Sequence, residues 1–253
     1  MEFLGMPDVT PAVFLWLCAS SMVTAFLGVS TGAAGGLLLL AIMTTVLPPL
    51  VLIPIHTVVQ LGSGVTRTLF MWRHVMVGTL APFIVGAVIG AAAGAHVFIA
   101  LPLSVLQGIL GAFIIAVTWL PKIGRVGGER ARYALLGFGT SFLGMFVSAT
   151  GTLLAPWVAS NAPNRHAQVA TFGALMAVTH IAKLVAFGFL GFAIGRYVPL
   201  MAGMVLTGAI GNWIGERALD RFSEGNFRWV FRSLLTLLGL RLIWVAVAEL
   251  GWI

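Results

Sequence analysis

Apolar residues follow one another along almost the whole chain in runs of about 20, separated by short polar links. A backbone in hydrocarbon must satisfy its own hydrogen bonds, and the runs lack the alternation of a barrel strand, so we predict helices throughout. In the first half the predicted segments are residues 11–31, 34–47, 50–71, 76–98 and 102–120. In the second half they are residues 133–148, 151–161, 166–190, 197–215 and 227–249. The second segment of each half is too short to span a bilayer comfortably.

The composition places these helices in a lipid bilayer. Hydrophobic residues make up 60% of the chain, charged residues only 8%, and the mean hydropathy is +1.06. These values exclude a soluble domain and predict an all-α integral membrane protein. The single cysteine excludes an internal disulfide and a cysteine metal cluster. Because the sequence also has no phosphate-binding loop and no zinc-ligand spacing, we expect no cofactor.

The two halves resemble each other. The stretch "FLGVSTGAAGGLL" (residues 26–38) aligns without a gap with "FLGMFVSATGTLL" (residues 142–154), at an offset of 116. Further along, "GAVIGAAAGAH" (residues 86–96) aligns with "GAIGNWIGER" (residues 208–217) once one residue is skipped. Two matching blocks in the same order indicate an internal duplication.

The distribution of basic residues predicts the topology. With five segments per half and the N-terminus outside, the inner side receives Arg67, Arg73, Lys122, Arg125, Arg130, Arg132, Arg165, Arg217, Arg221, Arg228 and Arg232. Four segments per half would move several of these arginines outside, which the positive-inside rule disfavours. An odd number of segments inverts the second copy. We therefore predict inverted repeats at residues 1–121 and 133–253, a basic cytoplasmic link at 122–132, both termini outside, and a shared site near the midplane.

Glycine-rich breaks precede both short segments. A break at membrane depth releases backbone N–H and C=O groups, which survive only where protein or a watered cavity covers them. The free N-terminus of the following half-helix presents N–H groups and the positive end of a dipole, which attract anions. The predicted lining is Ser30, Thr31, Gly32, Gly35 and Gly36 in the first copy, and Ser148, Thr150, Gly151 and Thr152 in the second. Alternatively, these small residues let helices approach closely.

Most of the remaining buried polarity lies on the third and eighth segments. The candidate binding residues there are His56, Thr57, Gln60 and Arg67, followed by Thr171, Thr179, His180 and Lys183. At the offset of 116, Arg67 aligns with Lys183, so each copy carries one cation on the corresponding helix. A charge inside a membrane helix is costly and therefore a functional candidate, although Arg67 could instead snorkel to the inner interface.

The acidic residues lie only in links, termini and helix ends: Glu2, Asp8, Glu129, Glu216, Asp220, Glu224 and Glu249. A cation carrier or a carboxylate proton relay would need one at mid-membrane, so the pattern predicts an anion pathway. If protons couple to transport, His56 and His180 are the available groups, although a membrane histidine can also serve only in packing. The net charge of +7 fits this topology, and nucleic acid is excluded as a partner.

A ladder of small residues, Gly86, Gly90 and Gly94, follows on the fourth segment. Such spacing is typical of close helix packing in membranes, either within one chain or across a dimer. The ladder therefore leaves a homodimer open.

The glycine-rich block, the short apolar runs and "PIHTVVQLGSGVTRTLFMWRHV", repeated more loosely after the basic link, resemble the sulfite exporter TauE/SafE family. This family is also called the 4-toluene sulfonate uptake permease family, and the resemblance covers nearly the whole chain. It implies a carrier of sulfur oxyanions or organosulfonates, such as sulfite, sulfoacetate or an aryl sulfonate, in the bacterial inner membrane.

The resulting hypothesis is a secondary transporter, not an enzyme, that binds its anion at the midplane and works by alternating access. A passive anion channel is the alternative within transport. A more remote alternative is an intramembrane hydrolase that would use Ser63 with a histidine. The sequence leaves the substrate, the direction of transport and the coupling ion open.

Overall fold

The computed structural model describes residues 3–7, 9–31, 35–98, 102, 105, 108–109, 112, 115–116, 129–147, 150–189, 194–218, 236–237, 240 and 243–248. This part of the chain is helical, apart from turns and an isolated β-bridge between Phe3 and Met6, and contains no strand. The prediction of an all-α protein is therefore confirmed. Most of the predicted segments 102–120 and 227–249 lie outside the described residues, as does most of the basic link 122–132.

The elements follow the predicted segments closely. The first half comprises α1 (Pro11–Thr31), α2 (Gly35–Met43), α3 (Pro49–Phe70), the 3-10 turns η1 (Trp72–His74) and η2 (Val77–Thr79), and α4 (Leu80–Phe98). The second half comprises α6 (Glu129–Val147), α7 (Gly151–Asn161), α8 (Arg165–Phe189), the 3-10 turn η3 (Ile194–Tyr197) and α9 (Val198–Ala218). Within the described residues, four helical stretches are long and apolar enough to cross a membrane: Pro11–Ser30, Val77–Val97, Arg165–Phe189 and Gly195–Ala218.

Several boundaries differ from the prediction by up to four residues: α2 ends at Met43 instead of residue 47, and α4 begins at Leu80 instead of residue 76. Helix α6 begins at Glu129, four residues before the predicted start at residue 133. The polar stretch "ERAR" was assigned to the link because it is charged. Glutamate, arginine and alanine are good helix formers, so these residues extend the helix beyond its apolar part.

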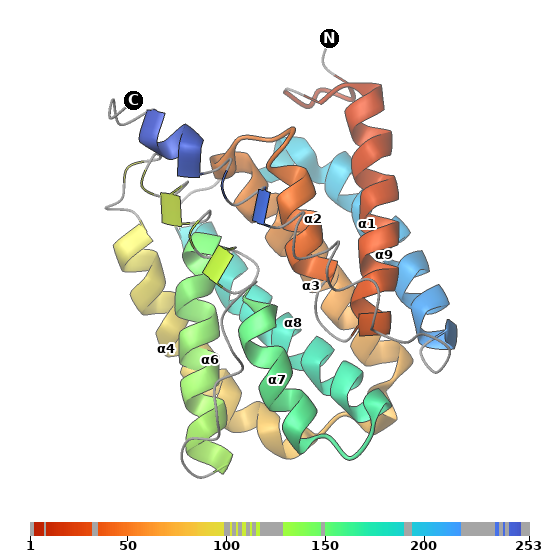
Figure 1. Ribbon diagram of the computed structural model, residues 1–253, viewed down its shortest axis with the longest axis vertical. Coiled ribbons are helices and arrows are strands. Elements are labelled where there is room, and N and C mark those ends of the chain that lie inside the picture. Colours follow the sequence, from red (N-terminus) through yellow and green to blue (C-terminus); the bar gives the residue numbers. More distant parts are fainter. Residues whose placement is uncertain are drawn as a thin grey trace.

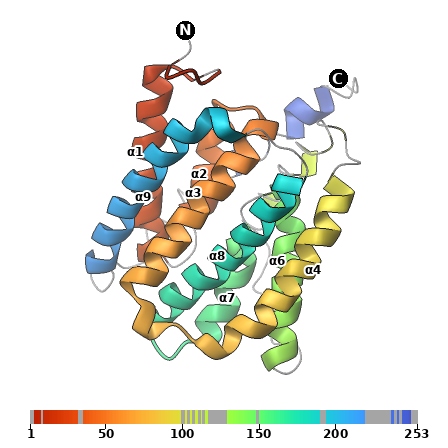
Figure 2. The same cartoon turned by 180° about the vertical axis from the view of Figure 1, so that it is seen from behind.

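The long helices form two side-by-side pairs, and each pair combines one helix from the first half of the chain with one from the second half. Helix α1 packs along α9, and α4 packs along α6 (Figures 1 and 2). In the second pair, Cβ atoms at Gly86 and Gly90 would overlap backbone atoms of Ala134 and Phe138. The glycine ladder is therefore used inside the chain, where it lets two helices approach closely.

Helices α3 and α8 join the two pairs by packing side by side (Figure 2). Where they approach closely, a Cβ on Gly64 would lie 2.8 Å from the Gly173 carbonyl oxygen, and a Cβ on Gly173 would lie 3.1 Å from the Gly64 carbonyl oxygen. The molecule thus consists of two bundles. Bundle A contains α1, α2, α3 and α9, bundle B contains α4, α6, α7 and α8, and the packing of α3 against α8 is their main contact.

The two side-by-side pairs of helices run in opposite directions. Figure 1 shows α1 and α9 running downward, while α4 and α6 run upward. The start of α1 and the helical residues 243–248 lie at the same upper end of the molecule. The first and last described segments are therefore on one side.

Candidate functional site

Both predicted breaks interrupt the helices. Helix α1 ends at Thr31 and α2 begins at Gly35, while α6 ends at Val147 and α7 begins at Gly151. The prediction of broken helices at the glycine-rich stretches is confirmed. Gly32 and Ser148 lie outside the described residues, as do the side chains of Thr31 and Thr152.

The glycines of the first break allow α2 to fold back onto its neighbours. A Cβ at Gly35 would overlap the Thr24 carbonyl oxygen of α1, and a Cβ at Gly36 would overlap Nε2 of the Gln60 side chain. The Gly36 carbonyl oxygen lies 2.9 Å from His56 Nε2. Because a carbonyl only accepts, Nε2 carries the hydrogen and donates it. The first break is thus held by two polar side chains of α3.

The second break lies under α8. Thr150 stands immediately before α7, but its Oγ1 donates to the Thr140 carbonyl oxygen of α6 at 2.9 Å. The Thr150 side chain therefore does not cap α7. The first N–H groups of α7 remain available at the positive end of the helix dipole. A Cβ on Gly151 would lie 2.7 Å from the Phe172 ring, which places α8 directly over this helix start.

Lys183 is the central charge of the site. It is fully buried, and a Cβ on Gly144 would lie 3.2 Å from Lys183 Cδ and 3.6 Å from Thr150 Oγ1. Lys183 therefore lies beside the second break. It is close enough to His56 and His180 to interact electrostatically with both imidazoles, which also interact with each other.

The two histidines reach this cluster from different bundles. His56 belongs to α3 in bundle A, whereas His180 stands one turn before Lys183 on α8 in bundle B. Both side chains are buried, and in the described part of the chain His180 Nδ1 has no hydrogen-bond partner. Helices α2, α3, α7 and α8 contain no acidic residue. The cluster can therefore offer positive charge and N–H donors to an anion.

Arg67 lies beside the first break. It is 5% exposed, its Nε donates to Asn212 Oδ1 of α9 at 3.1 Å, and a Cβ on Gly28 would overlap its Nη2. Asn212 Nδ2 in turn donates to the Ser63 carbonyl oxygen at 3.1 Å and to Thr66 Oγ1 at 2.8 Å. Asn212 was not among the predicted site residues. An asparagine within an apolar segment is the signal that could have identified it.

The hydroxyl groups of the other candidates are used within the protein. Thr57 Oγ1 donates to the Ile53 carbonyl oxygen, and Thr179 Oγ1 donates to the Leu175 carbonyl oxygen. Ser30 Oγ donates to the Phe26 carbonyl oxygen. Thr171 Oγ1 accepts the Met76 N–H at 2.9 Å, which ties the α3–α4 connection to α8. These four residues shape the helices around the site, and the three that donate, Ser30, Thr57 and Thr179, have no hydroxyl hydrogen to spare in this arrangement.

Apolar contacts close the space between the bundles on both sides of Lys183. Toward the start of α8, Val29 and Met71 of bundle A pack against Val169 and Ala170 of bundle B. At the same end, the Arg165 guanidinium donates to the Ser30 carbonyl oxygen. Toward the end of α8, Phe187 packs in a cluster that includes residues of α2 and α3. The cation cluster is therefore enclosed.

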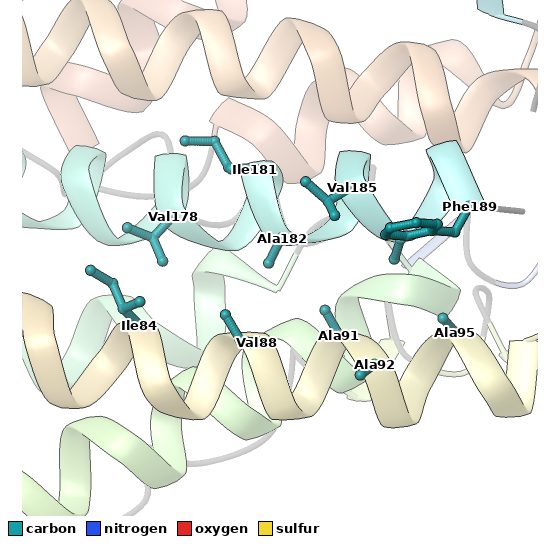
Figure 3. A pocket seen from close by; sticks show the side chains of 11 residues that line it. Ile84, Val88, Ala91, Ala92, Ala95, Val178, Ile181, Ala182, Val185 and Phe189 are labelled. Carbon is teal, nitrogen blue, oxygen red and sulfur yellow. The ribbon is translucent and has the colours of Figure 1, made fainter.

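A cavity of about 530 Å³ lies elsewhere, between α4 and α8 (Figure 3). Its lining is entirely apolar: Ile84, Val88, Ala91, Ala92, Ala95, Val178, Ile181, Ala182, Val185, Ala186 and Phe189. Without donors or charges this surface suits hydrocarbon and does not suit an anion.

The comparison with protein families decides the identity of the chain. The family model described as sulfite exporter TauE/SafE matches residues 17–242, which include both helix breaks and both buried cations. The chain belongs to the sulfite exporter TauE/SafE family. TauE/SafE proteins are membrane transporters of sulfite and sulfonates, so this TauE/SafE protein is a multi-pass membrane protein with a transport function. No curated protein and no solved structure matches the chain.

Proposed function

We propose that this TauE/SafE protein is a secondary transporter that moves a sulfur oxyanion or an organosulfonate across the inner membrane by alternating access. The anion binds between the two bundles, beside Lys183. The observation that carries this proposal is the full burial of Lys183 at a helix break, next to two buried histidines and among helices without acidic residues.

Electrostatics favours an anion at this position. A cation at membrane depth costs several kcal/mol in the absence of compensating charge or water. A bound oxyanion offsets that cost, and it can accept hydrogen bonds from the lysine ammonium, from the His180 imidazole and from N–H groups at the start of α7. Protonation of His56 or His180 would be the coupling event, since imidazole is the side chain that ordinarily titrates nearest to neutral pH.

The two-bundle architecture supports alternating access. We take the halves as inverted repeats because α1 and α6 occupy equivalent places and run in opposite directions (Figure 1). The bundles contact each other mainly where α3 packs against α8, and η1, η2 and η3 form the short connections between them. Rocking about the close approach of Gly64 and Gly173 would open one apolar closure at a time. Closures at both ends favour a transporter over a passive anion channel.

The ends of the helices support the proposed topology. Basic residues stand near the end of α3, the starts of α6 and α8 and the end of α9, and all of these lie at the lower end of the molecule (Figure 1). Arg196 of η3 precedes the start of α9, at the upper end. By the positive-inside rule we assign the lower end to the cytoplasm, with the basic link inside and both termini outside.

An intramembrane hydrolase, the remote alternative, would depend on Ser63. Asn212 Nδ2 donates to Ser63 Oγ at 3.1 Å, so the hydroxyl belongs to the Arg67–Asn212 group. This engagement supports a structural role for Ser63 and a transporter rather than an enzyme.

Uptake into proteoliposomes tests the proposal. Lys183→Met should abolish uptake of labelled sulfite or sulfoacetate, whereas Lys183→Arg should retain part of it because the charge remains. Arg73→Met is the matched control, since Arg73 is an exposed cation whose loss should leave uptake unchanged. Uptake by Lys183→Met at the wild-type rate would refute the assigned site. Accumulation of anion against its gradient under a pH difference would exclude a passive channel.

A thermal-shift screen would rank the substrates. Sulfite, sulfate, sulfoacetate, taurine and an aryl sulfonate should raise the apparent melting temperature in the order of their affinity, because each binds only the folded state.

A further inference from the structure

Arg67 has hydrogen-bond donors that no described residue accepts. Its side chain is 95% buried, and Nε donates to Asn212 Oδ1, but in the described part of the chain neither Nη atom donates a hydrogen bond. The helix that carries Arg67 contains no acidic residue, and Asn212 is a neutral partner. A buried guanidinium therefore keeps its charge and four N–H groups uncommitted.

Asn212 fixes the orientation of the Arg67 guanidinium. Its amide is held in turn by the Ser63 carbonyl oxygen and Thr66 Oγ1, so the acceptor for Nε cannot rotate freely. With Nε fixed on α9, Nη2 lies against Gly28 on α1, where the absence of a side chain leaves room for it. The uncommitted edge of the guanidinium thus faces the first helix break, next to Gly35 at the start of α2.

We propose that Arg67 and Asn212 form a second oxyanion subsite, separate from the one at Lys183, and that the protein holds two substrate anions at once. This inference rests on the proposed function. A guanidinium presents paired N–H groups that match two oxygens of a sulfite or sulfonate group, so Arg67 binds the anion and Asn212 is a positioning residue.

The two subsites lie at different depths. Arg67 follows His56 by three helical turns along α3, toward the end that we assign to the cytoplasm. Its Nη2 lies at Gly28 of α1, whereas His56 Nε2 contacts the Gly36 carbonyl oxygen of α2. An anion can therefore occupy the Arg67 subsite at the inner end while another occupies the Lys183 subsite. Repulsion between the two would help each to leave.

Calorimetric titration of the purified full-length protein with sulfite and with sulfoacetate tests this proposal. The wild type should bind two anions per chain, and Arg67→Met and Lys183→Met should each bind one. Arg67→Lys keeps the charge but loses the fork, so the affinity of one site should fall tenfold or more while the other is unchanged. Arg73→Met should still bind two.

Two further variants guard against misfolding of Arg67→Met. Gly28→Ala keeps Arg67 but places a methyl group where Nη2 lies, and Asn212→Asp supplies a carboxylate that occupies the guanidinium. Each should reduce the stoichiometry to one. A stoichiometry of one in the wild type, or of two in Arg67→Met, Gly28→Ala and Asn212→Asp alike, would overturn the second subsite. Neither result touches the proposed function, which fails instead if Lys183→Met transports like the wild type.

Discussion

Arg67 and Lys183 lie against equivalent glycines in the two halves of the chain. The Arg67 guanidinium contacts Gly28 of α1, and the Lys183 side chain packs on Gly144 of α6. Each pair is related to the other by the same offset of 116 residues. Both glycines precede a helix break, so each half brings a buried cation to the end of its broken helix.

Gly144→Ala tests the packing of Lys183. The new Cβ would lie 3.2 Å from Lys183 Cδ, which is tight against a flexible side chain. We expect the lysine to shift by a few tenths of an ångström, so that the affinity for sulfite falls severalfold while the melting temperature changes little. Titration calorimetry and a thermal melt measure the two effects.

Gly139→Ala on the same helix is the matched control. A Cβ there would meet no atom within 4 Å, so binding should equal that of the wild type. An equal loss of affinity in both variants would show that the effect comes from α6 in general and does not come from Lys183.

Gly90→Ala tests the packing of α4 on α6. The added Cβ would overlap the Phe138 backbone, which cannot move aside as a side chain can. Overpacking of this kind typically costs about 1–3 kcal/mol, so the melting temperature should fall clearly. Gly78→Ala, where a Cβ meets nothing within 4 Å, should melt like the wild type. A Gly90→Ala protein as stable as that control would contradict the close approach of the two helices.

Asn212→Leu tests the polar group that holds Arg67. Leucine has a similar size but removes the acceptor for Arg67 Nε and the donor to Thr66 Oγ1. Leaving such buried groups unsatisfied costs about 1–3 kcal/mol each, and more for the charged one. We expect a large loss of stability, measured by thermal melting in detergent. Asn212→Asp should restore most of it, because a carboxylate again accepts from Nε. Equal melting of both variants would argue against the hydrogen bond as the cause.

The sequence predicted the segments well and their partners poorly. Local signals determined the breaks at Gly35 and Gly151, because glycine and hydroxyl residues interrupt otherwise uniform apolar runs. The exchange of α4 and α9 between bundles was not predicted, since which helix lies beside which depends on packing between residues far apart in the chain. Asn212 was missed for the same reason: its importance comes from Arg67, 145 residues away.

The predicted site residues likewise divide into those identified by a local signal and those whose role depends on distant contacts. His56, His180 and Lys183 were chosen for their charge or polarity in an apolar environment, and the structure brings them together. Thr171 was chosen by helical spacing alone, and its hydroxyl oxygen accepts the Met76 N–H. Periodicity identifies a face of a helix, but it cannot identify what that face contacts.

Arg165→Gln tests the closure at the end we assign to the cytoplasm. Arg165 stands at the start of α8 in bundle B and donates to the Ser30 carbonyl oxygen of bundle A, directly beside the apolar contacts of Val169 with Val29 and Met71. Removing the charge-assisted hydrogen bond weakens the link between the bundles, so the inner end should open more often. A cysteine at position 169 reports this opening, in a background where the single native cysteine, Cys18, is replaced by alanine. In that background Arg165→Gln should raise the rate of maleimide labelling at Val169→Cys severalfold. Saturating sulfite should change the rate less in the variant than in the parent, because the closed state is no longer favoured by this hydrogen bond. Arg196→Gln, which removes a cation from the opposite end of the molecule, should leave labelling unchanged. If Arg165→Gln and its parent label at the same rate, the contact does not hold the two bundles together.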